Sequence, residues 1–404
     1  MDDKKTFTMI AKTFSGMEDI LMNELEAIGA TNTKKLTRAV EFEGDNAVMY
    51  KANLYCRTAL RILKNYTTFE AANEQQLYDE IKKINWSEHF SLYQTFAIDA
   101  TLSHSNLNHS QYAAQKAKDA IADQFREAMD KRPSVDTENP DLRIHLHVYD
   151  NKCTLSFDSS GESLHKRGYR DLTNQAPINE ALAAGLVLWS GWDKQSTFVD
   201  FMCGSGTILI EAAMIARNIA PNKLKKKFGF QSWKDYDEPL WAEIYDDALM
   251  EEKPSLDFKI IGADKSGIVL DKARQNIFNA GLENDIELQK GLFENFIPPT
   301  NSGVLITNPP YGVRIEDDDL LNTYKKIGDT LKKNFAGWKA WIFTGNLELA
   351  KFIGLRPTRK LHLFNGPIEC RFLKFEIYSG TKRIHKFRKE NVDAADQESN
   401  KQLE

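Results

Sequence analysis

The sequence predicts a mixed α/β protein in which an α+β module precedes a larger domain built on a parallel sheet. Three observations support this. The chain has 404 residues, enough for more than one domain. Up to residue 160, short strand and helix patterns alternate. After Ser159-Ser160-Gly161, long helical patterns alternate with short continuous apolar runs, which is typical of a parallel sheet covered on both faces.

Periodicity places the elements of the N-terminal module. We expect strands over 7–11, 39–43, 61–66, 96–101, 143–149 and 152–158, and helices over 17–28, 45–54, 74–81 and 111–129. The first helix should stop at Gly29. Asp150-Asn151 suits a tight hairpin turn between the last two strands.

The elements of the C-terminal part are predicted from its continuous apolar runs and the helical patterns between them. We expect parallel strands over 198–200, 258–263, 286–288, 304–307 and 340–343, and an antiparallel hairpin around Asn365-Gly366. Helices should begin at Thr207 and Ser266. Residues 217–256 are interpreted as an insertion after the first of these helices. From Thr381 onward the sequence is charged and polar, so 381–404 is expected to be a disordered tail.

Bulk composition narrows the class of protein. Hydrophobic residues make up 42% and charged residues 27%, as in soluble globular proteins. The sequence has no run of about 18 apolar residues, so no membrane span is expected. The start of the chain does not suggest a signal peptide. The four cysteines are widely spaced, so we expect a reduced, cytoplasmic setting and no metal site. A net charge of -5 argues against unspecific coating of nucleic acid but permits a local basic face.

A Gly-rich turn follows the first apolar strand of the C-terminal part. Asp200 ends that strand, and Gly204 and Gly206 allow a tight turn that a ligand can approach before the helix begins at Thr207. Many strand-to-helix turns contain such glycines for geometry alone. The next strand ends at Asp264, where nucleotide-binding folds place an acid on ribose hydroxyls. Capping of the following helix is the alternative role for Asp264.

A second motif, Asn308-Pro309-Pro310-Tyr311, lies at the end of the strand over 304–307. The Asn308 side-chain oxygen and the Pro309 carbonyl could each accept one hydrogen of an exocyclic NH2 group, and Tyr311 could stack on its heterocycle. The alternative is a rigid proline turn. With the Gly-rich turn, the motif predicts an S-adenosylmethionine (SAM)-dependent methyltransferase acting on an amino group.

Three segments identify a family resemblance. They are 159–170 followed by Ala176-Pro177-Ile178-Asn179-Glu180, the turn from Asp200 to Thr207, and 308–312 followed by Val313-Arg314. Up to about Tyr378 the chain resembles the THUMP-domain class I RNA methyltransferases, in particular the bacterial enzymes similar to the N-terminal half of RlmL, which make N2-methylguanosine in 23S rRNA.

The resemblance implies a domain layout and a set of site residues. The layout is a ferredoxin-like domain over 1–60, a THUMP RNA-binding domain over 61–160, a Rossmann-like class I methyltransferase domain over 161–380 and the tail over 381–404. Catalytic residues would be Asn308, Pro309 and Tyr311. Cofactor residues would be Ala176, Pro177, Ile178, Glu180, Asp200, Met202, Cys203, Gly204, Ser205, Gly206, Thr207, Asp264, Lys265, Phe293 and Asn308. Many relatives carry an acid near the adenine amino group where this chain has Gly291 and Leu292, so Phe293, Glu294 or backbone groups would contact adenine.

Basic residues favour RNA as the substrate. The expected RNA contacts are Lys166, Arg167, Arg170 and Arg314. The insertion places Lys223 and 225–227 beside Phe228, Phe230 and Trp233, a combination that suits phosphates and splayed bases. A solvated lysine face is the alternative there.

Guanine-N2 methylation of 23S rRNA is the function this sequence favours, with the base flipped out of its helix. Four alternatives stay open: guanine-N2 methylation of tRNA, adenine-N6 methylation, methylation of a protein glutamine, and a non-catalytic RNA-binding assembly factor.

Overall fold

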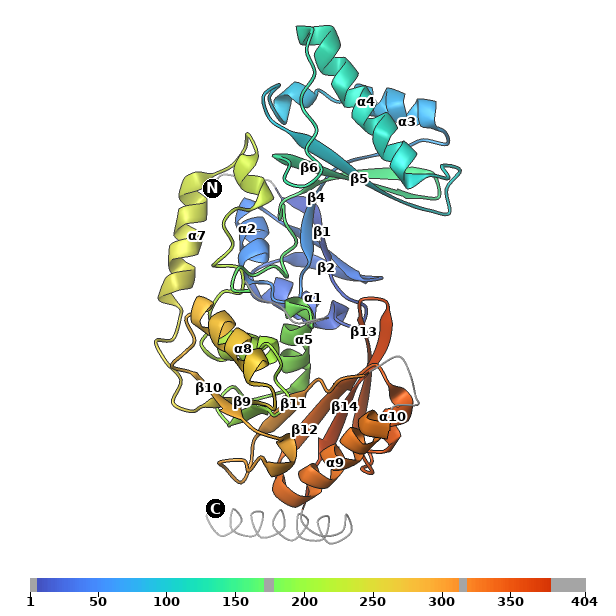
Figure 1. Cartoon of the computed structure of the whole chain (residues 1–404). Helices are drawn as coiled ribbons and strands as arrows, with labels where there is room; N and C mark the ends of the chain where they lie inside the picture. Colours follow the sequence, from blue (N-terminus) through green and yellow to red (C-terminus); the bar gives the residue numbers. More distant parts are fainter. Residues whose placement is uncertain (1–5, 171–177, 312–317, 379–404) are drawn as a thin grey trace, which may run out of the picture. The chain divides into compact units, whose positions relative to one another are not determined.

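The computed structural model describes residues 6–170, 178–311 and 318–378, and it divides the chain into two compact units (Figure 1). Unit 1 contains Met1–Gly168 and Asn218–Glu252, and unit 2 contains Tyr169–Arg217 and Lys253–Glu404. Residues 217–256 were predicted to be an insertion in the C-terminal domain, but the 218–252 segment within them packs with the N-terminal unit. The predicted tail over 381–404 lies outside the described residues.

Unit 1 is built on one seven-stranded sheet with the order β2-β3-β1-β4-β7-β6-β5. Its elements are β1 (Phe7–Lys12), α1 (Glu18–Ala27), β2 (Thr31–Leu36), β3 (Ala39–Gly44), α2 (Asn46–Tyr55), β4 (Arg61–Glu70), α3 (Glu74–Lys82), η1 (Trp86–Glu88), β5 (Phe96–Ser103), α4 (Ser110–Met129), β6 (Leu142–Tyr149), β7 (Lys152–Asp158), η2 (Gly229–Ser232) and α7 (Glu238–Met250). Pairing of β1 with β4 makes the sheet continuous between the regions expected to be ferredoxin-like and THUMP.

One strand and one α-helix of unit 1, β2 and α7, were not predicted from the sequence. β2 is an edge strand whose residues TNTKKL are all exposed or half-exposed, so it lacks the apolar alternation of a buried strand, although charged edges are common. α7 begins at the Asp237 cap, whose carboxylate accepts from the Leu240 amide at 3.1 Å, with a proline in its first turn.

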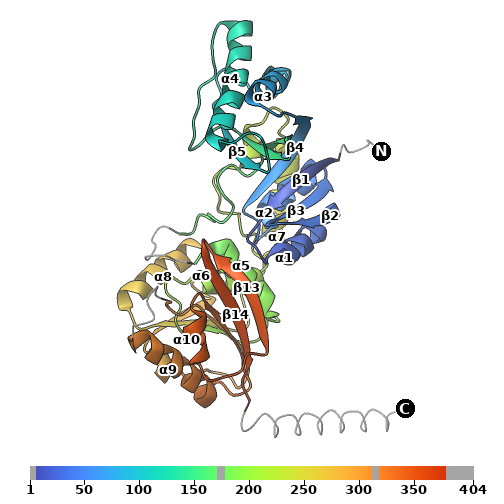
Figure 2. The ribbon, with the colours of Figure 1, turned by 90° about the vertical axis from the view of Figure 1, so that its right-hand side faces the viewer.

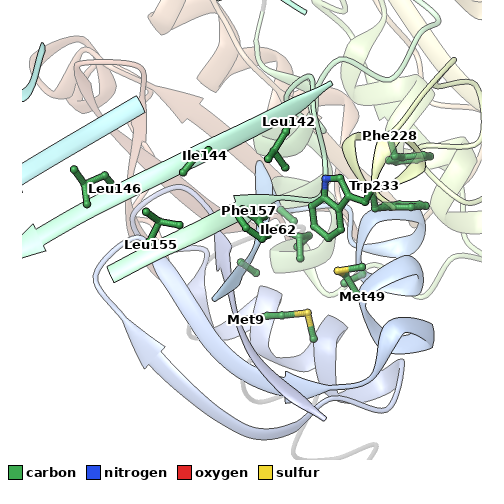
Figure 3. Packing of buried hydrophobic residues seen from close by; sticks show 14 of the residues in the cluster. Met9, Met49, Ile62, Leu142, Ile144, Leu146, Leu155, Phe157, Phe228 and Trp233 are labelled. Carbon is green, nitrogen blue, oxygen red and sulfur yellow. The ribbon is translucent and has the colours of Figure 1, made fainter. Parts of the chain in front are cut away.

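The 218–252 segment completes the core of unit 1 with its aromatic side chains. Phe228, Phe230 and Trp233 are only 2%, 0% and 8% exposed, and Phe230 stacks on Tyr50 of α2 with ring centroids 4.3 Å apart. Figure 3 shows Phe228 and Trp233 among the packed side chains of this core. This corrects their interpretation as surfaces for splayed bases, because rings with so little exposure are packed against the protein itself.

Unit 2 is built on a second seven-stranded sheet with the order β10-β9-β8-β11-β12-β14-β13. Its elements are α5 (Glu180–Ser190), β8 (Phe198–Asp200), α6 (Thr207–Ala216), β9 (Ile260–Asp264), α8 (Gly267–Asn279), β10 (Ile286–Lys290), η3 (Phe293–Asn295), β11 (Val304–Thr307), α9 (Asp318–Asn334), β12 (Lys339–Thr344), α10 (Leu347–Lys351), β13 (Arg359–Asn365) and β14 (Ile368–Glu376). The first five strands of that order pair in parallel.

The predicted parallel sheet and closing hairpin are confirmed. Every residue of β8 and β11 is buried, which explains their continuous apolar sequences. β14 pairs antiparallel with both β12 and β13, and Figure 2 shows β13 and β14 side by side. Chain order reverses at β8, which lies between β9 and β11. Ligands of open α/β sheets bind outside the carboxyl ends of strands at such a point. None of the helices in the described ranges is long and apolar enough to cross a membrane.

Candidate active site

The two sequence motifs meet at the carboxyl ends of β8 and β11. The Thr307 hydroxyl donates to Asp200 Oδ1 at 2.8 Å, and the Met202 amide donates to the same oxygen at 3.1 Å. Asp200 is 1% exposed and Thr307 is fully buried. Thr307 therefore connects the Gly-rich turn to the strand that carries the second motif, a role that was not predicted from the sequence.

Burial changes the acidity of Asp200. Loss of solvation raises the pKa of this carboxyl to about 7, although hydrogen bonds from Thr307 and Met202 act in the opposite direction, and the charge of Asp264 adds to the increase. Near neutral pH the carboxyl is thus close to its midpoint. A positively charged ligand beside it would favour the ionised form.

The Gly-rich turn requires glycine at two positions. Gly204 has φ +55° and Gly206 has φ +83°, a region that other L-residues adopt with strain. No heavy atom of the described residues lies within 4 Å of the position of a Cβ on Gly204, so the backbone there faces open space among them. The turn leads into the N-terminus of α6, where backbone amides lack partners within the helix. Cys203, Ser205 and Thr207 in the turn are buried, and Met202 is half-buried.

Asp264 supports the same turn from the end of β9. One carboxylate oxygen accepts from the Gly204 amide at 3.2 Å and the other from the Ser266 amide at 2.9 Å. Ser266, rather than Asp264, caps α8 by accepting from the Val269 amide at 3.4 Å. Each carboxylate oxygen has a second acceptor site, so Asp264 retains capacity for ligand hydroxyls. The neighbouring Lys265 is exposed.

Arg170 joins the starts of α5 and α6. Its guanidinium donates to the Thr207 hydroxyl at 2.7 Å and to the Ile178 carbonyl at 3.1 Å, and its Nε lies 3.2 Å from Glu180 Oε1. With its side chain only 12% exposed, Arg170 is committed to these internal partners, which corrects its assignment as an RNA contact. Ala176 and Pro177, expected beside them, lie outside the described residues.

Arg167 is also an internal residue. It is 1% exposed, and its guanidinium donates to the carbonyls of Leu164 and Arg57 and to the Asn222 side chain. This corrects the second of the expected RNA contacts. Lys166 is exposed and pairs with Glu162 at 2.5 Å, so it remains available at the surface. Arg314 lies outside the described residues.

The second motif combines a buried acceptor with a fixed aromatic ring. Asn308 Oδ1 is buried and accepts no hydrogen bond from any residue in the described ranges. Pro309 beside it is buried. The Tyr311 hydroxyl accepts from Asn365 Nδ2 at 2.8 Å, and burial raises the pKa of this phenol to about 12. A Cβ on Gly345 would lie 2.9 Å from the Tyr311 ring, so the glycine after β12 makes room for that ring.

The region expected to hold adenine contains apolar side chains beside the acidic Glu294. Phe293 is half-buried and stacks on Phe201 with ring centroids 5.4 Å apart. Glu294 pairs with Lys326 at 3.0 Å. Leu292 and Ile268, in the segments after β10 and β9, are 51% and 75% exposed. Exposed apolar side chains at the carboxyl edge of a sheet suit the faces of a purine.

Comparisons with known proteins assign the three regions of the chain. An RMKL-like methyltransferase domain matches residues 167–374, a THUMP domain matches 71–158, and an RlmL ferredoxin-like domain matches 8–63. The chain belongs to the RMKL-like methyltransferase family. The predicted resemblance is therefore confirmed at the level of the family.

Individual relatives of this RMKL-like methyltransferase are similar over most of its length. A Synechocystis sp. protein, slr0064, provisionally named an RNA methyltransferase, is 41% identical over 384 residues that cover 94% of this chain and 100% of the relative. The ribosomal RNA large subunit methyltransferase K/L of Syntrophotalea carbinolica is 39% identical over 90% of this chain. The matched region makes up 52% of that relative, so this chain spans about half its length.

A solved structure supports the same fold. SMU.472, provisionally named a methyltransferase and crystallised in complex with SAH, superposes with a TM-score of 0.84 at 30% identity, covering 94% of this chain and 100% of that one. Within this family framework, Thr307, Asn365 and Gly345 are the site residues that sequence reasoning missed. The one sequence feature that points to them is their position at the ends of apolar strands, which meet at one edge of the sheet.

Proposed function

We propose that this chain transfers a methyl group from SAM to the exocyclic N2 of a guanine in 23S rRNA. The coarser activity, SAM-dependent methylation of RNA, follows from the methyltransferase family, the THUMP domain and relatives named as RNA and ribosomal RNA methyltransferases. The proposal adds three details to this activity: the base is guanine, the methylated atom is N2, and the RNA is 23S rRNA.

The residues at the carboxyl edge of unit 2 fit this cofactor. Gly204 leaves open space beside a turn with positive φ, and Asp264 keeps acceptor capacity that suits ribose hydroxyls. Asp200 and Glu180 place carboxylates at the ends of β8 and the start of α5, which suit the positively charged end of the cofactor. The cofactor supplies an electrophilic methyl group on a sulfonium, so the chain needs neither a metal nor a strong base.

The observation that carries the proposal is the buried oxygen of Asn308. A buried acceptor without a donor costs roughly 1–3 kcal/mol, and an incoming NH2 group supplies that donor. With one hydrogen on Asn308 Oδ1 and the other on the Pro309 carbonyl, the amine lone pair points away from both acceptors and toward the methyl group. The same acceptors favour the positive charge that develops on nitrogen during transfer. The Tyr311 ring, fixed by Asn365, can stack on the heterocycle.

The choice of guanine and of 23S rRNA draws on the relatives. The name of the Syntrophotalea carbinolica relative specifies large subunit ribosomal RNA, and the family resemblance supplies guanine N2. Acceptors for an NH2 group do not themselves distinguish guanine from adenine, or from a glutamine side chain.

The test is product analysis with the full chain. Purified protein, labelled SAM and unmodified 23S rRNA are incubated, with 16S rRNA and tRNA in parallel, and the RNA is digested to nucleosides. We expect label in N2-methylguanosine from 23S rRNA only.

Other labelled products would each reject a different part of the proposal. Labelled methyladenosine would retain the site and reject guanine, whereas label only in tRNA would reject 23S rRNA. Absence of label from every RNA, including assembly intermediates, together with intact cofactor binding, would favour a protein substrate.

A further inference from the structure

A cleft lies in unit 1, which does not contain the methyltransferase motifs. It has a volume of about 860 Å³ and is lined by residues of β1, the start of α2, β4, the η1 region, β6, β7 and the 233–240 segment. This size is within the range of small-molecule and cofactor pockets. Several segments that are distant in sequence therefore contribute to one concave surface within a single compact unit.

A partly exposed aromatic ring lines this cleft. Tyr66 on β4 is 42% exposed, although its ring stacks on Phe157 with centroids 5.1 Å apart and an interplanar angle of 25°. His89 packs edge-on against the same ring at 4.6 Å. A ring that is supported in this way keeps one orientation while part of it faces solvent, which favours stacking with a flat ligand because little side-chain entropy is lost.

Two further rings of the lining carry nitrogen atoms without partners. Trp233 Nε1 and His89 Nε2 are buried and form no hydrogen bond with residues of the described ranges. Trp233 as a whole is 8% exposed. In Figure 3 the indole nitrogen lies on the side of the ring that faces Leu142, another residue of the cleft. Burial lowers the pKa of His89, so its imidazole is neutral near pH 7 and can donate or accept.

The charges of the lining favour a neutral ligand over a phosphate. Lys64 is paired with Asp235 at 3.2 Å and lies 4.2 Å over the Phe7 ring, so its charge is already compensated. Asp45 and Asp237 cap α2 and α7, and Glu88 also lines the cleft. Lys234, the other cation of the lining, donates to the Ser87 carbonyl. Such a lining is rich in acceptors for amino groups.

We propose that this cleft binds one unpaired nucleobase of the RNA substrate, stacked on Tyr66, at a distance in sequence from the base that is methylated. A flat heterocycle with amino groups matches the exposed Tyr66 ring and the carboxylates of the lining, while its phosphates stay outside the cleft. The proposal rests on RNA being the substrate. It adds a second, non-catalytic base site, which anchors the RNA on unit 1.

The test compares Tyr66→Ala with Tyr66→Phe in the full chain, using unmodified 23S rRNA as the probe in a direct binding assay. Loss of one base–aromatic stacking contact weakens binding about 5- to 150-fold, so we expect Tyr66→Ala to fall in this range and Tyr66→Phe to bind like the unaltered protein. Tyr93→Ala is the matched control, because Tyr93 is 90% exposed and is not part of the cleft lining. Cofactor affinity should be the same in all four proteins.

A measurement without any substitution covers the case in which Tyr66→Ala fails to fold. Ultraviolet crosslinking of the unaltered protein to the same RNA, followed by mass spectrometry, should give nucleotide adducts on the peptide containing Tyr66. Unchanged RNA affinity in Tyr66→Ala, or adducts only elsewhere, would overturn the proposal.

The outcomes separate this site from the methylation itself. If Tyr66→Ala methylates naked RNA normally but fails on ribosomal particles, a protein occupies the cleft and the nucleobase proposal is wrong. If any of these results rejects the nucleobase site while the unaltered protein still labels RNA, the proposed function remains intact. An unaltered protein that neither binds nor methylates any RNA would contradict both.

Discussion

Asn365 Nδ2 donates a hydrogen bond of 2.8 Å to the Tyr311 hydroxyl. Tyr311 follows β11 in the parallel part of the sheet, whereas Asn365 ends β13 in the antiparallel hairpin. The hairpin therefore does more than close the sheet of unit 2, because it also fixes the ring that we expect to stack on the target base. Asn365 is accordingly a positioning residue, since it would act on the substrate through Tyr311.

Replacing Asn365 with alanine should impair use of RNA and spare the cofactor. The lost hydrogen bond frees the Tyr311 ring, and one such bond is typically equivalent to about 0.5–1.5 kcal/mol, so we expect kcat/KM for RNA to fall by about 2- to 12-fold. Tyr311→Phe should cause a similar loss. In the double variant the losses should not add, because both changes remove the same bond. Steady-state kinetics and calorimetric cofactor binding check this; additive losses would contradict the positioning role.

Asn308→Ala should separate turnover from cofactor binding. The Asn308 oxygen is expected to hold the substrate amine, and removing one such polar group from a site that stabilises developing charge typically costs roughly 10²–10³ in kcat. Cofactor affinity should stay close to that of the unaltered protein. Single-turnover methyl transfer and calorimetry provide the two readouts. Equal loss of both would mean that Asn308 supports the structure of the site instead.

Prediction from the sequence succeeded where local pattern determines structure. Continuous apolar runs identified β8 and β11, and a parallel sheet necessarily brings their carboxyl ends, with Asp200 and Asn308, to one edge. The partners across the fold could not be inferred in this way. Asn365 is 54 residues from Tyr311, and no short-range pattern links an asparagine beside a hairpin turn to a distant phenol.

The basic segment before α5 shows the opposite limitation. A run of cations in sequence favours an exposed face, and Lys166 is indeed exposed. Arg167 is buried because the chain supplies carbonyl acceptors from Leu164 and from the distant Arg57. Whether an arginine faces RNA or the protein depends on these tertiary acceptors, which the sequence of the segment does not contain.

Arg167→Ala should therefore destabilise unit 1 rather than weaken RNA binding directly. Removing a buried, hydrogen-bonded guanidinium leaves several buried acceptors unpaired, which we expect to lower the free energy of unfolding by about 3 kcal/mol or more. Lys166→Ala is the matched control and should change it by no more than about 0.5 kcal/mol. Urea unfolding measures both. An unchanged stability for Arg167→Ala, combined with weaker RNA binding, would restore the original RNA assignment.

Asp200 should make the cofactor-free protein less stable as pH rises. Its pKa is about 7 in the folded chain and about 3.9 when unfolded. Below about pH 4 both states carry the proton. Between about pH 4 and 7 the unfolded state releases it while the folded state retains it, so this contribution to stability is lost as pH rises through 7.

The contribution of Asp200 to the pH dependence of stability has an upper limit, and Asp200→Asn is its control. About three pKa units correspond to at most about 4 kcal/mol in the free energy of unfolding. Asp200→Asn resembles the protonated acid and cannot titrate, so the difference in stability between the unaltered protein and this variant should change by up to that amount from about pH 4 to 8. Urea unfolding across this range, without cofactor, measures the difference. A difference that is constant with pH, or one that favours the unaltered protein at high pH, would mean that the buried carboxylate is ionised in the folded chain, stabilised by partners that outweigh its desolvation.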